Sequence, residues 1–143
     1  KKNTKLTEEY GKSSFEFAYI MDEDEEERRR GITINTATAF FKTKNKNFSI
    51  IDAPGHIDFI SNMITGASQA ECGLLVIDAH TGAYERGWNG GSTKDHAIIA
   101  RSLGVQQLVV AVNKLDMDEW KEERFDQISQ EVLPFLESIG FKS

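Results

Sequence analysis

From Ala39 onward, short apolar runs alternate with longer segments whose apolar residues recur every three or four positions. The short runs predict strands at 39–43, 47–52, 73–79 and 106–113, the first two joined by the polar turn "KNKN". The helical spacing predicts helices over 57–67, 93–103 and 125–139, the last closed by Gly140. This order predicts an α/β fold, a doubly wound and mostly parallel sheet with helices on both faces.

Before Ala39 the pattern changes. The stretch "SSFEFAYI" predicts a short amphipathic helix around 15–20, and the block that follows it, 22–30, contains only charged residues. Such a block has no apolar side chain to bury, so we expect it to be solvated and mobile when no ligand is bound.

Composition narrows the function classes. A chain of 143 residues is long enough for one domain, and its formal net charge of −6 disfavours a protein whose whole surface grips nucleic acid. A local basic patch or a larger parent protein could still contact RNA, and we expect no direct sequence-specific nucleic-acid binding. Cys72 is the single cysteine and precedes an apolar run, which predicts a buried, reduced thiol and a cytoplasmic protein. No apolar run approaches the roughly 20 residues of a membrane helix.

Polar residues follow three of the predicted strands where each one ends. They are Asp52, Asp78 and the segment "NKLD" at 113–116. Ligands of parallel sheets bind at the carboxyl ends of the strands. Asp52 is followed by a Pro-Gly turn, a typical place for a metal ion and phosphate oxygens: Asp52 would hold Mg²⁺ through a water, and the Gly55 amide would donate to a terminal phosphate.

The segment "NKLD" points to a purine site. Asp116 can accept two hydrogen bonds from the ring N–H and the exocyclic amine of guanine, a donor pair that adenine lacks. The apolar stem of Lys114 can cover the purine face, and Asn113 can bond the base edge. A lone tetrapeptide of this kind is also ordinary loop sequence, but its position in register with "DAPGH" favours the functional interpretation.

His56 and Thr33 each have two interpretations. An imidazole at His56 can orient an attacking water, or it can be a helix cap or surface residue; a zinc site with Asp58 is disfavoured, because residues two apart do not share a helix face. In "RRRGITI", Thr33 can complete a Mg²⁺ shell in a switch segment, or it can simply begin a strand. His80 and His96 have no partners at ligand spacing.

The motifs "RRRGITI", "DAPGH" and "NKLD", with "NMITGASQAE" and "GAYERGWNGGSTKDH", resemble the guanine-nucleotide-binding domain of translational GTPases along almost the whole chain. The last of these segments, read as a glycine-rich loop, is similar to the branch that contains elongation factor 1-alpha, the release-factor GTPase and the ribosome-rescue GTPase that works with Pelota. The compact join "NKLDMDEWKEERFDQI" looks most like the rescue GTPase.

The resemblance implies a P-loop GTPase fold, with residues 1–143 forming a partial GTP-binding domain, switch I at about 22–35 and switch II at about 52–68. It implies GTP or GDP and Mg²⁺ as ligands. It implies that Thr33 and Asp52 bind Mg²⁺, that Gly55 contacts the terminal phosphate and that His56 orients the attacking water. Guanine would be bound by Asn113, Lys114 and Asp116.

The implied function is GTP hydrolysis in ribosome rescue and mRNA surveillance, with the ribosome and a Pelota-like or release-factor-like protein as partners. Alternatives are a release-factor or elongation-factor GTPase, a non-hydrolysing scaffold module of the same fold, and an unrelated doubly wound domain with chance loop motifs. Guanine selectivity distinguishes the GTPases from the other two, and the scaffold module predicts no nucleotide binding even in the full-length protein.

The phosphate loop, G-x-x-x-x-G-K-[ST], is not found in the chain. The stretch "GKSS" at 11–14 does not qualify, because the first glycine of the motif would fall on Leu6 and no strand precedes it. We therefore expect a fragment of a longer protein, incomplete at both ends, which lacks its central strand, folds poorly or exposes an unpaired edge, and is inactive alone.

Overall fold

The computed structural model describes residues 25–30 and 32–142, and the chain divides into two compact units, residues 1–66 and 67–143. Among the described residues, none of the helices combines the length and the apolar character that crossing a membrane requires.

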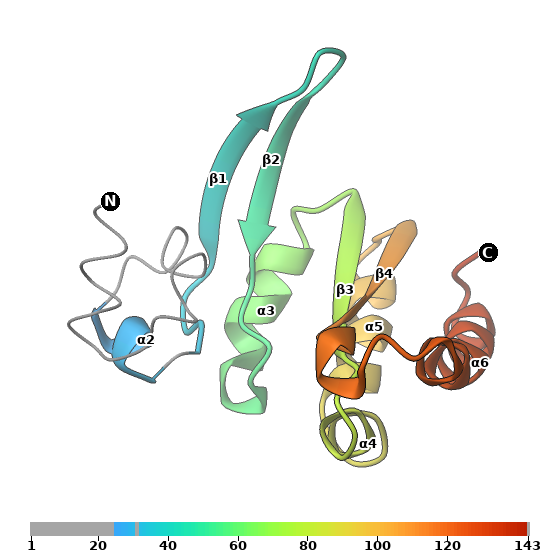
Figure 1. The fold of residues 1–143 in the computed structure, drawn as a ribbon. Coiled ribbons are helices and arrows are strands. Elements are labelled where there is room, and N and C mark those ends of the chain that lie inside the picture. The colour runs from blue at the N-terminus through green and yellow to red at the C-terminus, as the bar shows by residue number, and fades with distance from the viewer. Residues whose placement is uncertain (1–24, 31, 143) are drawn as a thin grey trace. The chain divides into compact units, whose positions relative to one another are not determined.

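The first unit is built on a β-hairpin. Strands β1 (Ala37–Lys42) and β2 (Asn47–Asp52) pair antiparallel, with Ala37 opposite Asp52 (Figure 1). The Thr43 amide donates to the Lys46 carbonyl at 2.8 Å and closes the tip. A 3₁₀ turn, η3 (Ile57–Phe59), and helix α3 (Ile60–Ala67) follow β2. The predicted hairpin and the predicted helix after it are both confirmed.

The charge block is more ordered than we expected. Its residues 25–30 form helix α2 (Glu25–Arg30), and the side chain of Glu27 is buried rather than solvated. The physical reason is that the carboxylate satisfies backbone donors: Glu27 Oε1 accepts hydrogen bonds from the amides of Ile34 and Asn35, each at 2.8 Å. The helix predicted around 15–20 lies outside the described residues.

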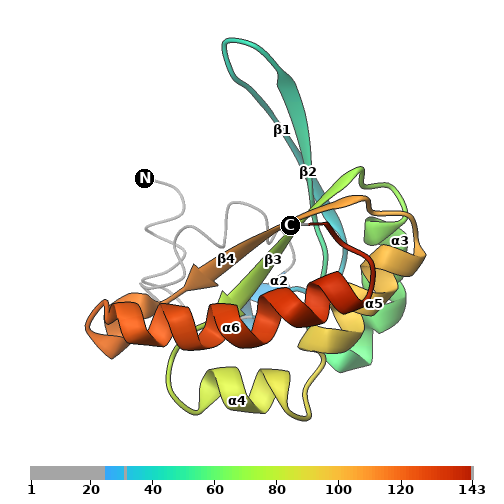
Figure 2. The same ribbon diagram turned by 90° about the vertical axis from the view of Figure 1, so that its right-hand side faces the viewer.

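The second unit contains a parallel strand pair and three α-helices. Strands β3 (Cys72–Asp78) and β4 (Gln107–Asn113) pair with Asp78 opposite Asn113. The helices are α4 (Ala83–Trp88), α5 (Thr93–Ser102) and α6 (Glu122–Ser138), with a 3₁₀ turn, η4 (Leu115–Asp118), before the last. Figure 2 shows α6 running in front of both strands.

One face of this strand pair carries the core. Leu75 and Ile77 of β3 pack with Val110 of β4 against side chains of all three helices, and Ile128 of α6 is fully buried. The opposite face stays open in this unit, since Leu74 is 65% and Val109 57% exposed. The α/β class with a parallel sheet is confirmed, whereas the described helices of this unit cover one face and not two.

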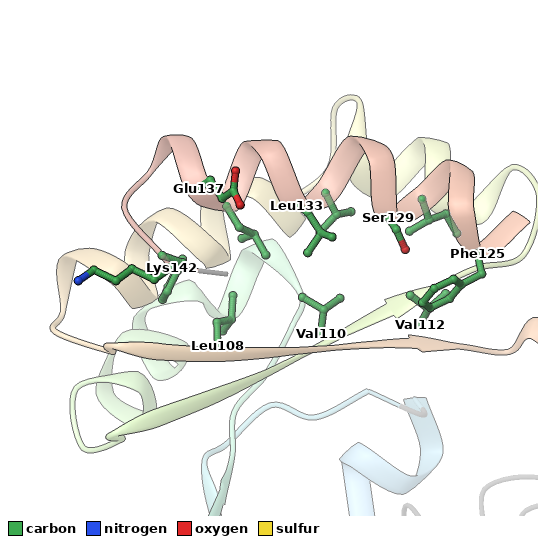
Figure 3. Close-up of a pocket in the computed structure, with 12 residues that line it drawn as sticks. Leu108, Val110, Val112, Phe125, Ser129, Leu133, Glu137 and Lys142 are labelled. Atoms are coloured by element: carbon green, nitrogen blue, oxygen red, sulfur yellow. The ribbon is translucent and has the colours of Figure 1, made fainter.

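A groove of about 240 Å³ lies between β4 and α6 (Figure 3). Leu108, Val110 and Val112 form its floor, and Phe125 and Leu133 line the helix side. The latter two remain 45% and 49% exposed, so the outer edge of α6 is not closed over by the described residues.

Three local predictions need comment. The glycine-rich loop contains a helix, α4, which we did not predict; its signal is the pair Tyr84 and Trp88, four residues apart and both buried. Cys72 is exposed, not buried, at the start of β3. Gly140 does close α6: its φ is +100° and its amide donates to the Glu137 carbonyl at 3.0 Å.

Candidate functional site

The turn after β4, residues 113–118, is named here the base turn. Asn113 ends β4, and its Oδ1 accepts a hydrogen bond from the Lys114 amide at 2.9 Å. Lys114 has a left-handed backbone with φ of 62°, and η4 follows directly. Asp116 lies in η4 and is exposed. The three predicted base-binding residues are thus brought together in one tight turn.

The base turn is conformationally strained. Lys114 has a left-handed backbone, and so do the two residues that follow the base turn, Glu119 and Trp120, with φ of 59° and 56°. A left-handed backbone costs roughly 1–2 kcal/mol per non-glycine residue. Contacts from elsewhere must therefore hold this conformation.

Those contacts come from the turn after β3, residues 78–82, named here the β3 turn. Asp78 Oδ2 accepts from Lys114 Nζ at 2.8 Å, and Asp78 Oδ1 accepts from the His80 amide at 3.0 Å. Burial alone would raise the pKa of the Asp78 carboxyl, but the Lys114 ammonium and the His80 amide together hold that pKa below its usual value. Asp78 is therefore an ionised anchor for Lys114.

A second contact joins the far ends of the two turns. Asp118 Oδ1 accepts from the Thr81 hydroxyl at 2.7 Å and Asp118 Oδ2 accepts from the Thr81 amide at 3.1 Å. The hydroxyl bond is the main cause that lowers the pKa of Asp118. His80 Nδ1 lies 3.7 Å from the same carboxylate. Thr81 and Asp118, 37 positions apart in sequence, thus join one turn to the other.

Arg124 of α6 supports the β3 turn by hydrogen bonds. Its side chain is 9% exposed; Nε donates to the Ala79 carbonyl at 2.8 Å and Nη1 to Glu85 Oε1 at 2.9 Å. The guanidinium lies 5.3 Å from the Tyr84 ring. Sequence analysis missed Arg124, although an arginine on the same helix face as Ile128 was a usable signal.

The other predicted residues lie in the first unit. Asp52 ends β2 and is half-buried; burial, with the nearby charge of Glu27 as a smaller cause, raises the pKa of its carboxyl. Pro54 is fully buried, and Gly55 is exposed with open space where a Cβ would lie. The chain beyond Asp52 is thus buried at the proline and exposed at the glycine.

His56 is the N-cap of η3. Its Nδ1 accepts from the Asp58 amide at 3.2 Å, and its exposed ring lies 5.8 Å from that of Phe59. Because Nδ1 accepts, the neutral ring carries its proton at Nε2. The helix-cap interpretation thus describes this geometry. Among the described residues no group of three His, Cys, Asp or Glu side chains is placed to hold a metal.

The segment that carries Thr33 is tied down just after it. Glu27 accepts from the amides of Ile34 and Asn35, and Asn62 Nδ2 of α3 donates to the Ile34 carbonyl at 2.8 Å. Thr36 Oγ1 returns a hydrogen bond to the Asn62 carbonyl at 3.1 Å. Thr33 itself is half-buried. These contacts fix the end of the segment and place Glu27 and Asn62 among the residues that sequence reasoning missed.

Comparison with known proteins follows from this geometry. Residues 1–143 match the family described as elongation factor Tu GTP binding domain. The chain is 52% identical over 134 residues to elongation factor 1-alpha of Absidia glauca, covering 93% of this chain and 29% of that protein. It is 49% identical over 138 residues to elongation factor 1-alpha of Coccidioides immitis (strain RS), covering 96% and 30%.

Two solved structures share the fold. A bacterial selenocysteine-specific elongation factor, EF-Sec, superposes with a TM-score of 0.71 at 29% identity, covering 85% of this chain and 20% of that one. The GTPase-like domain of S. cerevisiae Ski7, bound to GTP, superposes with a TM-score of 0.73 at 23% identity, covering 90% and 30%. The latter likeness concerns the fold alone.

Fold, strand-end residues and comparisons define a GTP-binding domain of the translation-factor class. The chain belongs to the elongation factor Tu GTP binding domain family. It spans about three tenths of the length of the elongation factor 1-alpha relatives that it matches.

Proposed function

We propose that the predicted site residues bind GTP, and that the longer protein hydrolyses GTP by attack of water. Asn113, Lys114 and Asp116 bind the base. Thr33 and Asp52 bind the Mg²⁺ ion, and Gly55 binds the terminal phosphate. The observation that carries this proposal is the base turn, which presents Asp116 to solvent while neighbouring side chains hold Lys114 in a left-handed backbone. An ionised Asp116 accepts from two donors of guanine, and the anchored Lys114 stem covers the base plane.

Asp52 and Thr33 fit a Mg²⁺ ion. Burial and the charge of Glu27 raise the pKa of Asp52, so the ionised carboxylate lies in surroundings that a cation would relieve. Mg²⁺, when bound, neutralises charge on the phosphates. The chain's own contribution is a carboxylate at the end of β2, the hydroxyl of Thr33, and the amide of Gly55 for the terminal phosphate.

His56 orients the attacking water in this proposal. Its Nδ1 is engaged by the Asp58 amide, which leaves the Nε2 side of an exposed ring for a water molecule. Residues of about 22–35 form switch I and those of about 52–68 form switch II. The hydrogen bonds that Glu27 and Asn62 make to the Ile34 and Asn35 backbone limit movement at the end of switch I.

The cellular role that we propose is action on the ribosome in the cytoplasm, with delivery of a Pelota-like factor to stalled ribosomes. The compact join "NKLDMDEWKEERFDQI" supports this branch. Delivery of another decoding-site factor, as by an elongation-factor or release-factor GTPase, is the alternative. Pull-down of Pelota from ribosome-bound complexes of the full-length protein, with release factor and aminoacyl-tRNA as the competing cargoes, distinguishes them.

The nucleotide function is tested by titrating fluorescent GDP into the full-length protein and into residues 1–143 alone. GTP and ATP serve as unlabelled competitors. We expect binding by the full-length protein only, displaced by GTP and not by ATP. Equal displacement by ATP would refute the guanine assignment, and absence of binding to either chain would leave a non-hydrolysing scaffold as the function.

A further inference from the structure

We propose that Asp78 and Thr81, in the β3 turn, are positioning residues for guanine recognition, because they fix Lys114 and Asp118 at the two ends of the base turn. This inference rests on the guanine binding proposed above. Asp78 ends β3, and the proposed contacts to the base and the phosphate give it no role. This inference assigns one.

The first step is the register of the parallel strands. Asp78 lies opposite Asn113, so the β3 turn and the base turn leave the sheet side by side. The two turns are further joined by a backbone bond from the Ala79 amide to the Asn113 carbonyl at 2.8 Å. Residues of the β3 turn are therefore direct neighbours of the base turn.

The second step is the grip on Lys114. Its Nζ lies 2.8 Å from Asp78 Oδ2, so the ammonium is drawn back over the strand ends. With Nζ fixed there, the methylene stem spans the edge of the turn, where it is available to an aromatic ring lying on it. Without the carboxylate, the lysine side chain would sample many rotamers, and ordering it on binding would weaken the affinity.

The third step is the grip on η4. Asp118 accepts two hydrogen bonds from Thr81, one from its hydroxyl at 2.7 Å and one from its amide at 3.1 Å. Asp118 is the last residue of η4 and lies directly before the left-handed Glu119. Holding it stabilises the strained exit of the turn, and Asp116, two residues earlier, keeps one orientation.

The chemistry that depends on this orientation is the pair of hydrogen bonds from guanine to Asp116. Hypoxanthine, the base of IDP, keeps the ring N–H but lacks the exocyclic amine. The ratio of GDP to IDP affinity therefore reports whether Asp116 reaches both donors at once. A residue that only supported the overall fold would lower both affinities together and leave the ratio unchanged.

The experiment uses the full-length protein and measures competition of GDP and IDP against fluorescent GDP. The variants are Asp78→Ala, Thr81→Val and Asp118→Ala, with Thr81→Ser as the conservative variant and Asp126→Ala, exposed on α6, as the matched control. We expect the GDP to IDP ratio to fall at least about fivefold in Asp118→Ala, less in Thr81→Val, and not in Thr81→Ser or the control. Asp78→Ala is expected to lower the same ratio, by less than Asp118→Ala does, because Lys114 at the start of the base turn loses its anchor.

A second measurement does not need nucleotide. The Trp120 amide donates to the Leu115 carbonyl at 2.9 Å across the turn, so its hydrogen exchange reports the turn directly. We expect faster exchange in Asp118→Ala and Thr81→Val than in the control. Parental ratios and parental exchange in all variants would overturn the positioning role alone. Failure of the unmutated full-length protein to bind GDP would overturn the guanine function together with this inference.

Discussion

The turns after β2 and after β4 both contain residues predicted to bind the nucleotide, but different contacts hold the two turns in place. Lys114 and Asp118 of the base turn are each bonded to a side chain of the β3 turn. In the turn after β2, Pro54 is buried, Gly55 is exposed, and His56 bonds only within its own turn, to the Asp58 amide. The turn predicted to bind the base is therefore held by side chains of a second turn, whereas the turn after β2 shows a local contact of His56.

The two strand-end aspartates make the same contrast in electrostatic terms. Lys114 and the His80 amide outweigh burial and lower the pKa of Asp78, whereas burial, together with Glu27, raises the pKa of Asp52. Asp78 already has its cation within the chain. Asp52 lies next to a second carboxylate, so a cation supplied from outside has more to stabilise there.

The largest effect is expected from Asp116→Asn in the full-length protein. The change removes the acceptor of two guanine donors and should lower GDP affinity at least about a hundredfold, since charge-assisted hydrogen bonds contribute about 1.5–3 kcal/mol each. Affinity for XDP, whose base has a carbonyl in place of the amine, should rise relative to GDP because the new amide can donate to it. Competition binding measures both, and an unchanged GDP to XDP ratio would place guanine elsewhere.

Glu27→Ala tests the phosphate side of the comparison. It leaves the Ile34 and Asn35 amides without their acceptor in two part-buried hydrogen bonds, and a hydrogen bond to a charged group contributes about 1.5–3 kcal/mol. Hydrogen exchange at these two amides should accelerate, while the GDP to IDP ratio should stay parental. The exposed neighbour Glu25 provides the control, as Glu25→Ala. A change in base preference would contradict the separation of the two regions.

Gly66→Ala probes how tightly α3 lies on β2. A Cβ at this position would come within 3.1 Å of Ala53 Cβ and 3.3 Å of Ile51 Cγ2, so the helix must move by a few tenths of an ångström. Overpacking costs about 1–3 kcal/mol, and the better helix propensity of alanine returns about 1. We expect a net loss near 1 kcal/mol by thermal unfolding. Gly90→Ala, which meets open space, should change little, and a stabilised Gly66→Ala would show that α3 is loosely seated.

The hydrophobic periodicity of the sequence predicted much of the fold, but it did not predict the side-chain contacts between distant segments. The apolar runs and the helical face around Ile128 predicted the strands and α6 because period is a local property. The contacts of Thr81 with Asp118 and of Glu85 with Arg124 join residues 37 and 39 positions apart, and no local pattern announces them. The motifs identified which residues could bind a nucleotide, while the side chains that hold them became visible only in the folded chain.

The smallest effect is expected from Glu85→Gln, which tests the contact with Arg124 that supports the β3 turn. The Arg124 guanidinium, which donates to Glu85, lowers the pKa of that carboxyl to about 2 from its usual 4.5. A depressed carboxyl pKa gives stability that is fully present above pH 4.5 and is lost as the pH falls toward 2. The Glu85 side chain is 39% exposed, so screening keeps the difference below about 1 kcal/mol.

Thermal unfolding of the parent and of Glu85→Gln from pH 7 to pH 2 makes this measurable. The variant should be slightly less stable at neutral pH, and the two curves should converge below pH 4.5, where the parent carboxyl becomes protonated on unfolding. Glu122→Gln, an exposed acid in the first turn of α6, should show no such convergence. A constant offset at every pH would mean that Glu85 supports the β3 turn by packing rather than by its charge on Arg124.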